Sequence, residues 1–132
     1  MVAERACHGH ELCEANKALV RRFYDEVFST GDASRIDEFM RDDYRQHSPG
    51  IADGKAGFLE FFEKFSALEP RFEMSILAAD GDYVFAFFKC VVAGGSVNKV
   101  VDIYRVEDGL LAEHWDVVNH DVGSLTSAHG LF

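Results

Sequence analysis

The feature that most constrains this chain is the segment Val100–His120, in which ionisable side chains interrupt an apolar strand pattern. The segment reads as two strands joined at Asp108-Gly109, a dipeptide typical of tight hairpin turns. Side chains alternate across a strand, so the pattern places Asp102 on one face of the first strand, and His114 with Asp116 on one face of the second. Ionisable groups among apolar neighbours are costly to bury unless they are paired or have a chemical role.

Two registers of this hairpin are compatible with the sequence, and they differ in the residue that faces Asp102. If Glu107-Asp108-Gly109 is a three-residue loop with Gly109 left-handed, Asp102 lies opposite His114. If Asp108-Gly109 is a two-residue loop, Asp102 lies opposite Trp115 instead. We favour the first register because it gathers Asp102, His114 and Asp116, whereas scattered buried charges would be harder to satisfy.

Size and charge limit the class of protein. A length of 132 residues suits one domain, residues 1–132, with a core over about 12–120 and terminal extensions at 1–11 and 121–132. The 23 acidic against 13 basic residues, a net charge of −10, argue against nucleic acid or an anionic membrane surface as partner. No apolar run approaches the roughly 20 residues of a membrane span. The N-terminus has no apolar signal core, and the three cysteines suggest reduced thiols, so we expect a cytoplasmic protein.

The periodicity of apolar residues predicts helices first and a sheet second. A helix is expected from Leu12 to Phe28, a short one after Asp32, and a third from Asp53 or Gly54 to a stop before Pro70. Residues 41–51 read as irregular or short and extended. Strands follow over 72–79, 82–93 and 96–107, before the last strand of the hairpin. This order predicts an α+β fold with helices on one side of a curved antiparallel sheet.

Several motifs make the chain resemble the SnoaL-like branch of the NTF2-like superfamily over about residues 16–120. They are Phe23-Tyr24-(x3)-Phe28-Ser-Thr-Gly-Asp32, Asp43-Tyr-Arg-Gln-His47-Ser-Pro, Asp53-Gly-Lys-Ala-Gly-Phe58, Asp102-Ile-Tyr-Arg-Val-(x2)-Gly109 and Glu113-His-Trp-Asp116. The resemblance implies a cone-shaped domain with a deep pocket between sheet and helices, in which acids and histidines transfer protons without a metal or organic cofactor. Such folds host cyclases, isomerases, dehydratases, epoxide hydrolases and binding modules, so fold alone does not assign the reaction.

The strand pattern and the resemblance together nominate the site residues. As catalytic residues we expect Asp102, His114, Asp116 and His47, and as substrate-binding residues Gln46, Tyr24 and Tyr104. A carboxylate next to an imidazole sets its tautomer, and an aromatic pocket desolvates a carboxylate. In the polyketide cyclases that the chain resembles, an Asp near the position of Asp116 is the proposed general acid/base.

Two functions from different classes remain open. The first is a cofactor-independent enzyme, an aldol-type cyclase, isomerase or dehydratase, acting on a small apolar carbonyl compound. An Asp or His114 would remove a proton α to the carbonyl, and His47 or a tyrosine hydroxyl would stabilise the oxyanion. The alternative is a non-catalytic ligand-binding or interaction module. The N-terminal tract Cys7-His8-Gly9-His10-(x2)-Cys13 lacks the spacing of a structural zinc site, so no metal is expected.

The strand face turned away from Asp102 predicts self-association. It is expected to carry Val101, Ile103, Leu111, Trp115 and Val117. An apolar surface of this extent is unfavourable in water, so we expect a homodimer through the outer sheet face.

Overall fold

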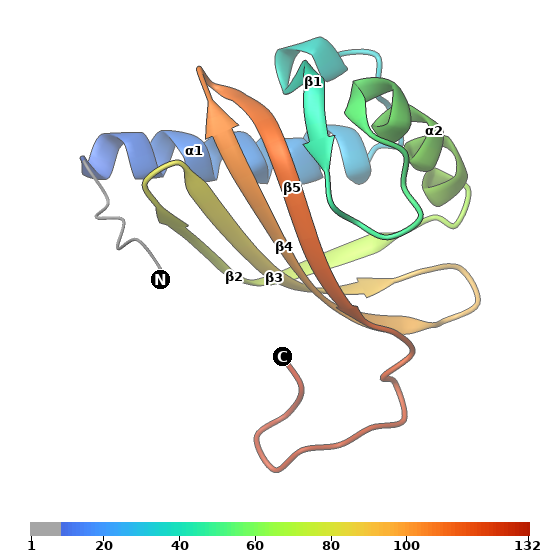
Figure 1. Cartoon of the computed structure of the whole chain (residues 1–132). Helices are drawn as coiled ribbons and strands as arrows, with labels where there is room; N and C mark the ends of the chain where they lie inside the picture. The colour runs from blue at the N-terminus through green and yellow to red at the C-terminus, as the bar shows by residue number, and fades with distance from the viewer. Residues whose placement is uncertain (1–8) are drawn as a thin grey trace.

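The computed structural model describes residues 9–132, so Cys7, His8 and most of the expected N-terminal extension lie outside the described residues. Two α-helices pack on a curved five-stranded sheet with strand order β1-β5-β4-β3-β2 (Figure 1). The elements are α1 (His10–Phe23), β1 (Met40–Gln46), α2 (Gly54–Ser66), β2 (Arg71–Asp80), β3 (Tyr83–Val91), β4 (Val97–Glu107) and β5 (Leu110–Asn119). The predicted α+β cone is confirmed.

The sheet is mixed, whereas an antiparallel sheet was expected. Strand β1 occupies the segment read as irregular or short and extended, and it pairs in parallel with β5 at the sheet edge. A parallel pair needs a long connection, and here the whole chain from α2 to β4 lies between the two strands. The backbone N–H of His47 continues the pairing by donating to the carbonyl oxygen of His114 at 3.0 Å.

The turn between β4 and β5 is the two-residue one, so the favoured three-residue loop is wrong. Both central residues have positive φ, 51° at Asp108 and 75° at Gly109, as the tight hairpin turn that suits strand twist requires. Glu107 accordingly pairs with Leu110.

A β-bulge at Ala112 then changes the register that this turn would otherwise impose. Val106 pairs with Leu111 and Arg105 with Glu113, so Ala112 has no partner on β4. One extra residue reverses the face of everything that follows it. Asp102 therefore lies opposite Asp116, and neither of the two expected cross-strand partners faces it directly.

The two-residue turn, which precedes the bulge, corrects the prediction for Leu111. Leu111 pairs with the buried Val106 and is 0% exposed, so it belongs to the core and not to the outer face. Ile103 and Trp115 pair directly on the outer face and are half-buried. Val117 on the same face is 69% exposed.

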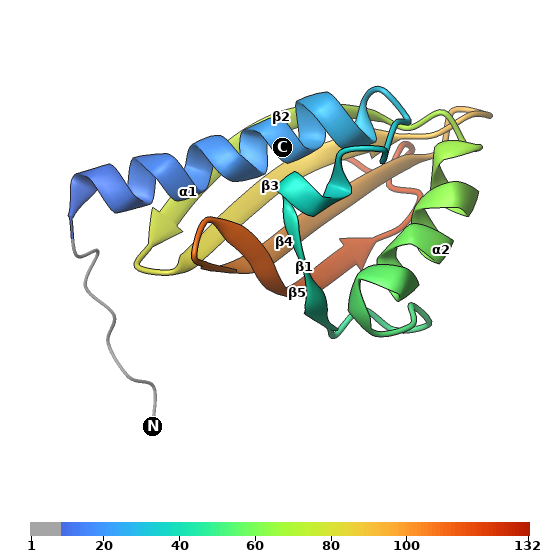
Figure 2. The ribbon, with the colours of Figure 1, turned by 90° about the horizontal axis from the view of Figure 1, so that it is seen from above.

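The helices cover the concave side of the sheet. Helix α1 contacts β2 and β3, while α2 contacts β1 (Figure 2). The helix expected to reach Phe28 does so through one π-helical turn, Tyr24–Phe28, closed by a hydrogen bond from Ser29 N–H to the Tyr24 carbonyl at 2.8 Å. Such turns occur frequently at functional sites, and this one places both of its end residues on the cavity wall.

The remaining segments are anchored to this frame. After β5 the tail returns along the side of the sheet opposite α1 (Figure 1), where Phe132 stacks on Phe87. Cys90 is a buried free thiol. Among the described residues no helix has the length and apolarity needed to cross a membrane.

Candidate active site

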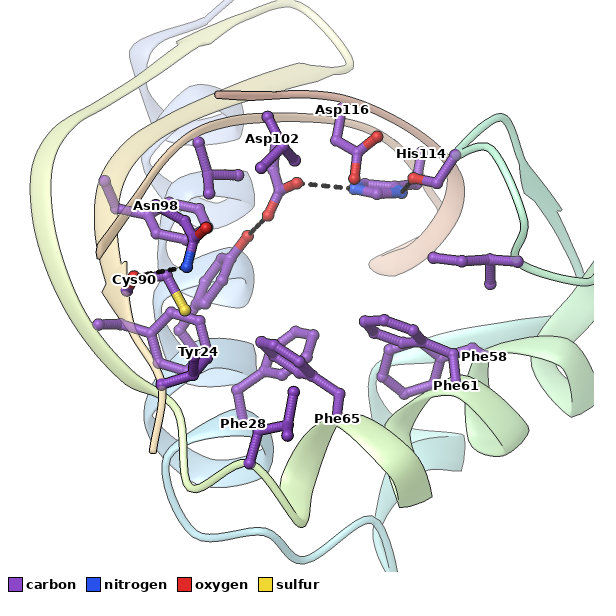
Figure 3. Close-up of a pocket in the computed structure, with 18 of the residues that line it drawn as sticks. Tyr24, Phe28, Phe58, Phe61, Phe65, Cys90, Asn98, Asp102, His114 and Asp116 are labelled. Atoms are coloured by element: carbon purple, nitrogen blue, oxygen red, sulfur yellow. Dashed lines mark hydrogen bonds and ion pairs between the residues drawn. The ribbon is translucent and has the colours of Figure 1, made fainter. Parts of the chain in front are cut away.

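A cavity of about 640 Å³ lies between the concave sheet and the helices. Its wall is mainly aromatic, formed by Tyr24, Phe28, Tyr44, Phe58, Phe61, Phe65, Phe72, Phe88 and Tyr104. Figure 3 shows the polar side chains of β4 and β5 gathered on one side and phenylalanines from the helical side facing them. A cavity of this size, apolar with a few convergent polar groups, suits a small organic ligand.

Asp102 and His114 form a buried pair on the sheet side of this cavity. Both are 7% exposed, and Nε2 of His114 lies 2.9 Å from Oδ1 of Asp102. The pair is diagonal, because Tyr104 lies directly opposite His114. The expectation that the two side chains are within hydrogen-bond reach is confirmed, although the register that was meant to produce it is wrong.

Two tyrosine hydroxyls extend this pair into a network. Tyr24 Oη donates to Oδ2 of Asp102, and Tyr104 Oη lies 2.8 Å from Tyr24 Oη. Burial, reinforced by the charge of Asp102, raises the pKa of both phenols well above that of free tyrosine. Both hydroxyls are therefore protonated donors whose hydrogen bonds lie within the network, and not free substrate contacts.

Strand alternation in β1 decides which side chains of that segment face the cavity. Tyr44, Gln46 and Ser48 all line it, while the intervening Arg45 and His47 point the other way. The Oε1 atom of Gln46 lies 2.7 Å from Nδ1 of His114. Had residues 41–48 been read as a strand, the two-residue period would have selected these cavity residues from the sequence.

His47 lies outside the cavity, so the expectation that it is a pocket residue is wrong. Its ring stacks on Trp115 with centroids 4.8 Å apart, and Nε2 lies 2.6 Å from Oε2 of Glu113. Arg105 donates to the other oxygen of Glu113 at 2.9 Å. Burial opposes ionisation of Glu113, but the hydrogen bonds from His47 and Arg105 outweigh it and hold the pKa of Glu113 below its ordinary value.

Asp116 lines the cavity directly opposite Asp102 on β5. Its carboxylate is half-buried, and it makes no hydrogen bond or ion pair within the part of the chain that the structure describes, residues 9–132. Asp116 thus differs from Asp102, whose oxygens are both engaged. It is the acid of the site with free capacity for a ligand.

Tyr44 is a cavity residue that sequence reasoning did not select. Its side chain is 2% exposed and its ring stacks against that of His114. Among residues 9–132 its hydroxyl has no hydrogen-bond partner. Burial raises the pKa of Tyr44 well above its ordinary value, with the charges of Asp102 and Asp116 adding to the effect. The hydroxyl therefore stays protonated and free to donate to a ligand.

The cavity wall away from the acids carries a smaller polar group. Asn98 Nδ2 donates to the carbonyl oxygen of Cys90 at 3.3 Å, and burial raises the pKa of the Cys90 thiol to about 11. Asn98 lies on the same face of β4 as Asp102, so the strand pattern could have found it.

The hydrogen bonds within the site do not favour a bound metal ion. Asp102, His114 and Asp116 offer ligand atoms within 4.8 Å of one another. However, both oxygens of Asp102 and both ring nitrogens of His114 already make hydrogen bonds inside the protein. An ion would have to displace these buried contacts.

The fold and cavity define this protein as a small α+β cone of the NTF2-like class. The chain belongs to the SnoaL-like domain family, whose model matches residues 20–114. No curated protein matches the chain at a significant level.

Solved structures agree with this fold. A candidate polyketide cyclase from Bacillus cereus superposes with a TM-score of 0.74 at 18% identity, covering 90% of this chain and 90% of the other. A candidate ketosteroid isomerase from Kribbella flavida gives 0.68 at 20% identity, covering 87% and 90%. An LEH-like epoxide hydrolase from M. tuberculosis gives 0.69 at 16% identity, covering 81% and 84%. At these identities the likeness shows the fold and leaves the reaction to the site.

Proposed function

We propose that this protein is a cofactor-independent acid/base enzyme that acts on a small, largely apolar carbonyl compound. One observation carries the proposal: the Asp116 carboxylate, without a partner among the described residues, lies on the wall of an aromatic cavity beside a fully bonded Asp102–His114 pair. A carboxylate in this setting is available to a ligand and partly desolvated, as a general base requires.

The proposed reaction begins with proton abstraction. Asp116 takes a proton from the carbon α to the substrate carbonyl. The electron pair of the broken C–H bond forms the C=C bond of the enolate, and the carbonyl π pair moves onto the oxygen. The Tyr44 hydroxyl donates a hydrogen bond to that oxygen, because it is protonated and otherwise unpaired among the described residues. His47, the other expected oxyanion donor, lies outside the cavity and has no part in this scheme.

Three reactions share this enolate. Attack of the enolate carbon on a second carbonyl of the same molecule gives an aldol-type cyclisation, and reprotonation at another carbon gives an isomerisation. Expulsion of a β-hydroxyl as water gives a dehydration. Solved structures that resemble this one are named for a cyclase or an isomerase, which supports the enolate class without selecting among the three.

The proposal is tested through its first step, which needs no knowledge of the product. Deuterium exchange at the α-carbons of 2-tetralone and 1-phenyl-1,3-butanedione in D₂O is followed by NMR. We expect the protein to accelerate exchange, and Asp116→Asn to lower that acceleration by roughly 100-fold or more, the range typical of general-base catalysis. Asp116→Asn leaves no buried partner without a hydrogen bond, so its melting temperature should be no lower than that of the wild type.

The control variant is Asp43→Asn, which removes an exposed acid paired with Arg41 outside the cavity. It should exchange at the wild-type rate. Equal exchange by Asp116→Asn and Asp43→Asn would exclude Asp116 as the base.

The non-catalytic alternative is favoured by a different observation. Every polar atom of Asp102 and His114 is already hydrogen-bonded, as in a pocket built for stability and binding. Saturable binding of the two ketones, with no exchange above the uncatalysed rate, would select a ligand-binding module.

A further inference from the structure

The side-chain amide of Gln46 has only one orientation that satisfies its surroundings. The same atom, Oε1, receives the backbone N–H of His47 at 3.1 Å and that of Ser48 at 3.0 Å. An amide nitrogen cannot accept hydrogen bonds, so the atom at this position is the oxygen. The His47 N–H is shared with the His114 carbonyl, but turning the amide over would leave the Ser48 N–H without an acceptor and set an NH₂ group against both donors.

This orientation decides which atoms of His114 carry hydrogen. Nδ1 of His114 lies 2.7 Å from the same Gln46 oxygen. Two acceptors cannot share a hydrogen bond without a proton between them, so Nδ1 is an N–H donor. The Ser48 hydroxyl, 3.4 Å from Nδ1, is at the long limit of contact and does not change this assignment.

The other ring nitrogen faces a carboxylate that already accepts elsewhere. Nε2 lies 2.9 Å from Oδ1 of Asp102, and Oδ2 of the same group accepts from the Tyr24 hydroxyl. The contact between Nε2 and Oδ1 holds one proton, whichever of the two atoms carries it. Nε2 is thus bonded to Asp102 and offers no lone pair to a substrate.

We infer that Gln46 is a positioning residue that keeps a proton on Nδ1 of His114, so that His114 has no nitrogen lone pair free in the site and is not its base. The ring faces Asp102 and Tyr104 from β4, Asp116 from β5 and Tyr44 from β1. Tyr24 from the π-turn contacts Asp102 and not the ring. Asp102 and Asp116 are directly opposite each other, a like-charge pairing that destabilises a sheet. The proton held between His114 and Asp102 offsets that repulsion.

The consequence for chemistry rests on the proposed function, whereas the proton assignment does not. With Nδ1 protonated and Nε2 bonded to Asp102, the ring cannot accept a proton from a substrate. Of the two bases considered for α-proton removal, only Asp116 remains. Gln46, which the sequence suggested as a substrate contact, acts instead through His114.

The test reads the protonation of the ring directly in the full chain. Uniformly ¹⁵N-labelled protein is examined at neutral pH by long-range ¹H–¹⁵N correlation of the imidazole groups, with His114→Asn to assign the signals. The wild type should show Nδ1 of His114 protonated. Gln46→Leu, which removes the acceptor, should leave Nδ1 unprotonated, with the ring proton on Nε2 facing Asp102. Gln46→Glu keeps an acceptor oxygen and should retain the wild-type pattern.

The control is His47→Asn, which alters the neighbouring histidine outside the cavity and should leave the His114 signals unchanged. A wild-type spectrum with an unprotonated Nδ1, or a folded Gln46→Leu variant with the wild-type pattern, overturns the inference. A merely structural Gln46 would lower the melting temperature of Gln46→Leu without moving these signals. If Gln46→Leu does not fold, the wild-type spectrum still decides. A loss of ketone exchange activity without any change in the His114 signals would concern the proposed function alone.

Discussion

The buried tyrosines of the cavity show how much a single hydroxyl depends on its neighbours. Tyr24 and Tyr44 are both protonated and both line the cavity. The Tyr24 hydroxyl is bonded to Asp102 and Tyr104, whereas that of Tyr44 has no partner among residues 9–132. One side chain therefore serves the network and the other is open to a ligand.

This contrast predicts opposite outcomes for two matched substitutions. Tyr24→Phe removes a donor from a buried carboxylate and should destabilise the protein by about 1–3 kcal/mol. Tyr44→Phe leaves no buried group without a hydrogen-bond partner, so its free energy of unfolding should stay within about 0.5 kcal/mol of wild type. The rate of ketone exchange should fall in this variant. Urea unfolding and the exchange assay measure the two effects. Equal destabilisation by both variants would contradict the assignment of Tyr44.

The same tyrosines predict a loss of stability in alkali. The pKa values of Tyr24, Tyr44 and Tyr104 are raised in the folded protein, first by burial. The unfolded chain releases these protons above pH about 10 while the folded state retains them, so the free energy of unfolding falls as pH rises through that range. Below it both states are protonated and the effect is absent. Urea unfolding at increasing pH should show this decline, with a smaller slope in Tyr104→Phe.

At the scale of elements, the position of helix α2 depends on one residue without a side chain. A Cβ added at Gly57 would lie 1.9 Å from the carbonyl oxygen of Ala52. The glycine thus permits the loop before α2 to pass against the helix, next to Phe58 in the core.

Gly57→Ala should therefore destabilise the protein by roughly 1–3 kcal/mol, the usual range for overpacking. Helix propensity alone predicts the opposite sign, a gain of about 1 kcal/mol. Thermal unfolding shows whether Gly57→Ala lowers or raises the stability. A variant as stable as wild type would mean that the loop before α2 moves aside freely.

The β4–β5 hairpin shows which features of an element the local sequence predicts and which it does not. Asp108-Gly109 predicted a tight turn, and the turn is there. The bulge at Ala112 has no local signal, because Ala fits a regular strand as well as a bulge. It forms because the shifted register brings His114 and Asp116 to the cavity while Leu111 stays buried opposite Val106, a gain that depends on packing across the whole sheet.

At the scale of the whole molecule, the outer sheet face is unusually apolar for an acidic chain. Ile76 is 57% exposed, Phe85 38% and Val117 69%, with Ile103 and Trp115 half-buried between them. The tail covers Phe87 on this side. A contiguous apolar surface of this kind usually marks an interface.

We expect two copies of the chain to associate through this face, as the sequence suggested with Leu111 removed from the interface. Light scattering at micromolar concentration should give the mass of a dimer. Val117→Asp should shift it to the monomer by placing unpaired charge in the interface, while Leu12→Asp, at an exposed apolar residue of α1, should not. A monomeric wild type would exclude the expectation.

The sequence by itself determined the order of elements and the acid–histidine character of the cavity. Helical periodicity and strand alternation are local properties, so they suffice to assign Phe58 and Asp102 to the interior. The tertiary structure decided which residues meet there. The pairing of β1 places Tyr44 and Gln46 inside and His47 outside. The two-residue turn places Leu111 in the core, and the bulge at Ala112 brings His114 to the cavity. These placements follow from pairing between strands distant in sequence, where a shift of one residue exchanges the two faces, and only the packing of the complete sheet selects one of them.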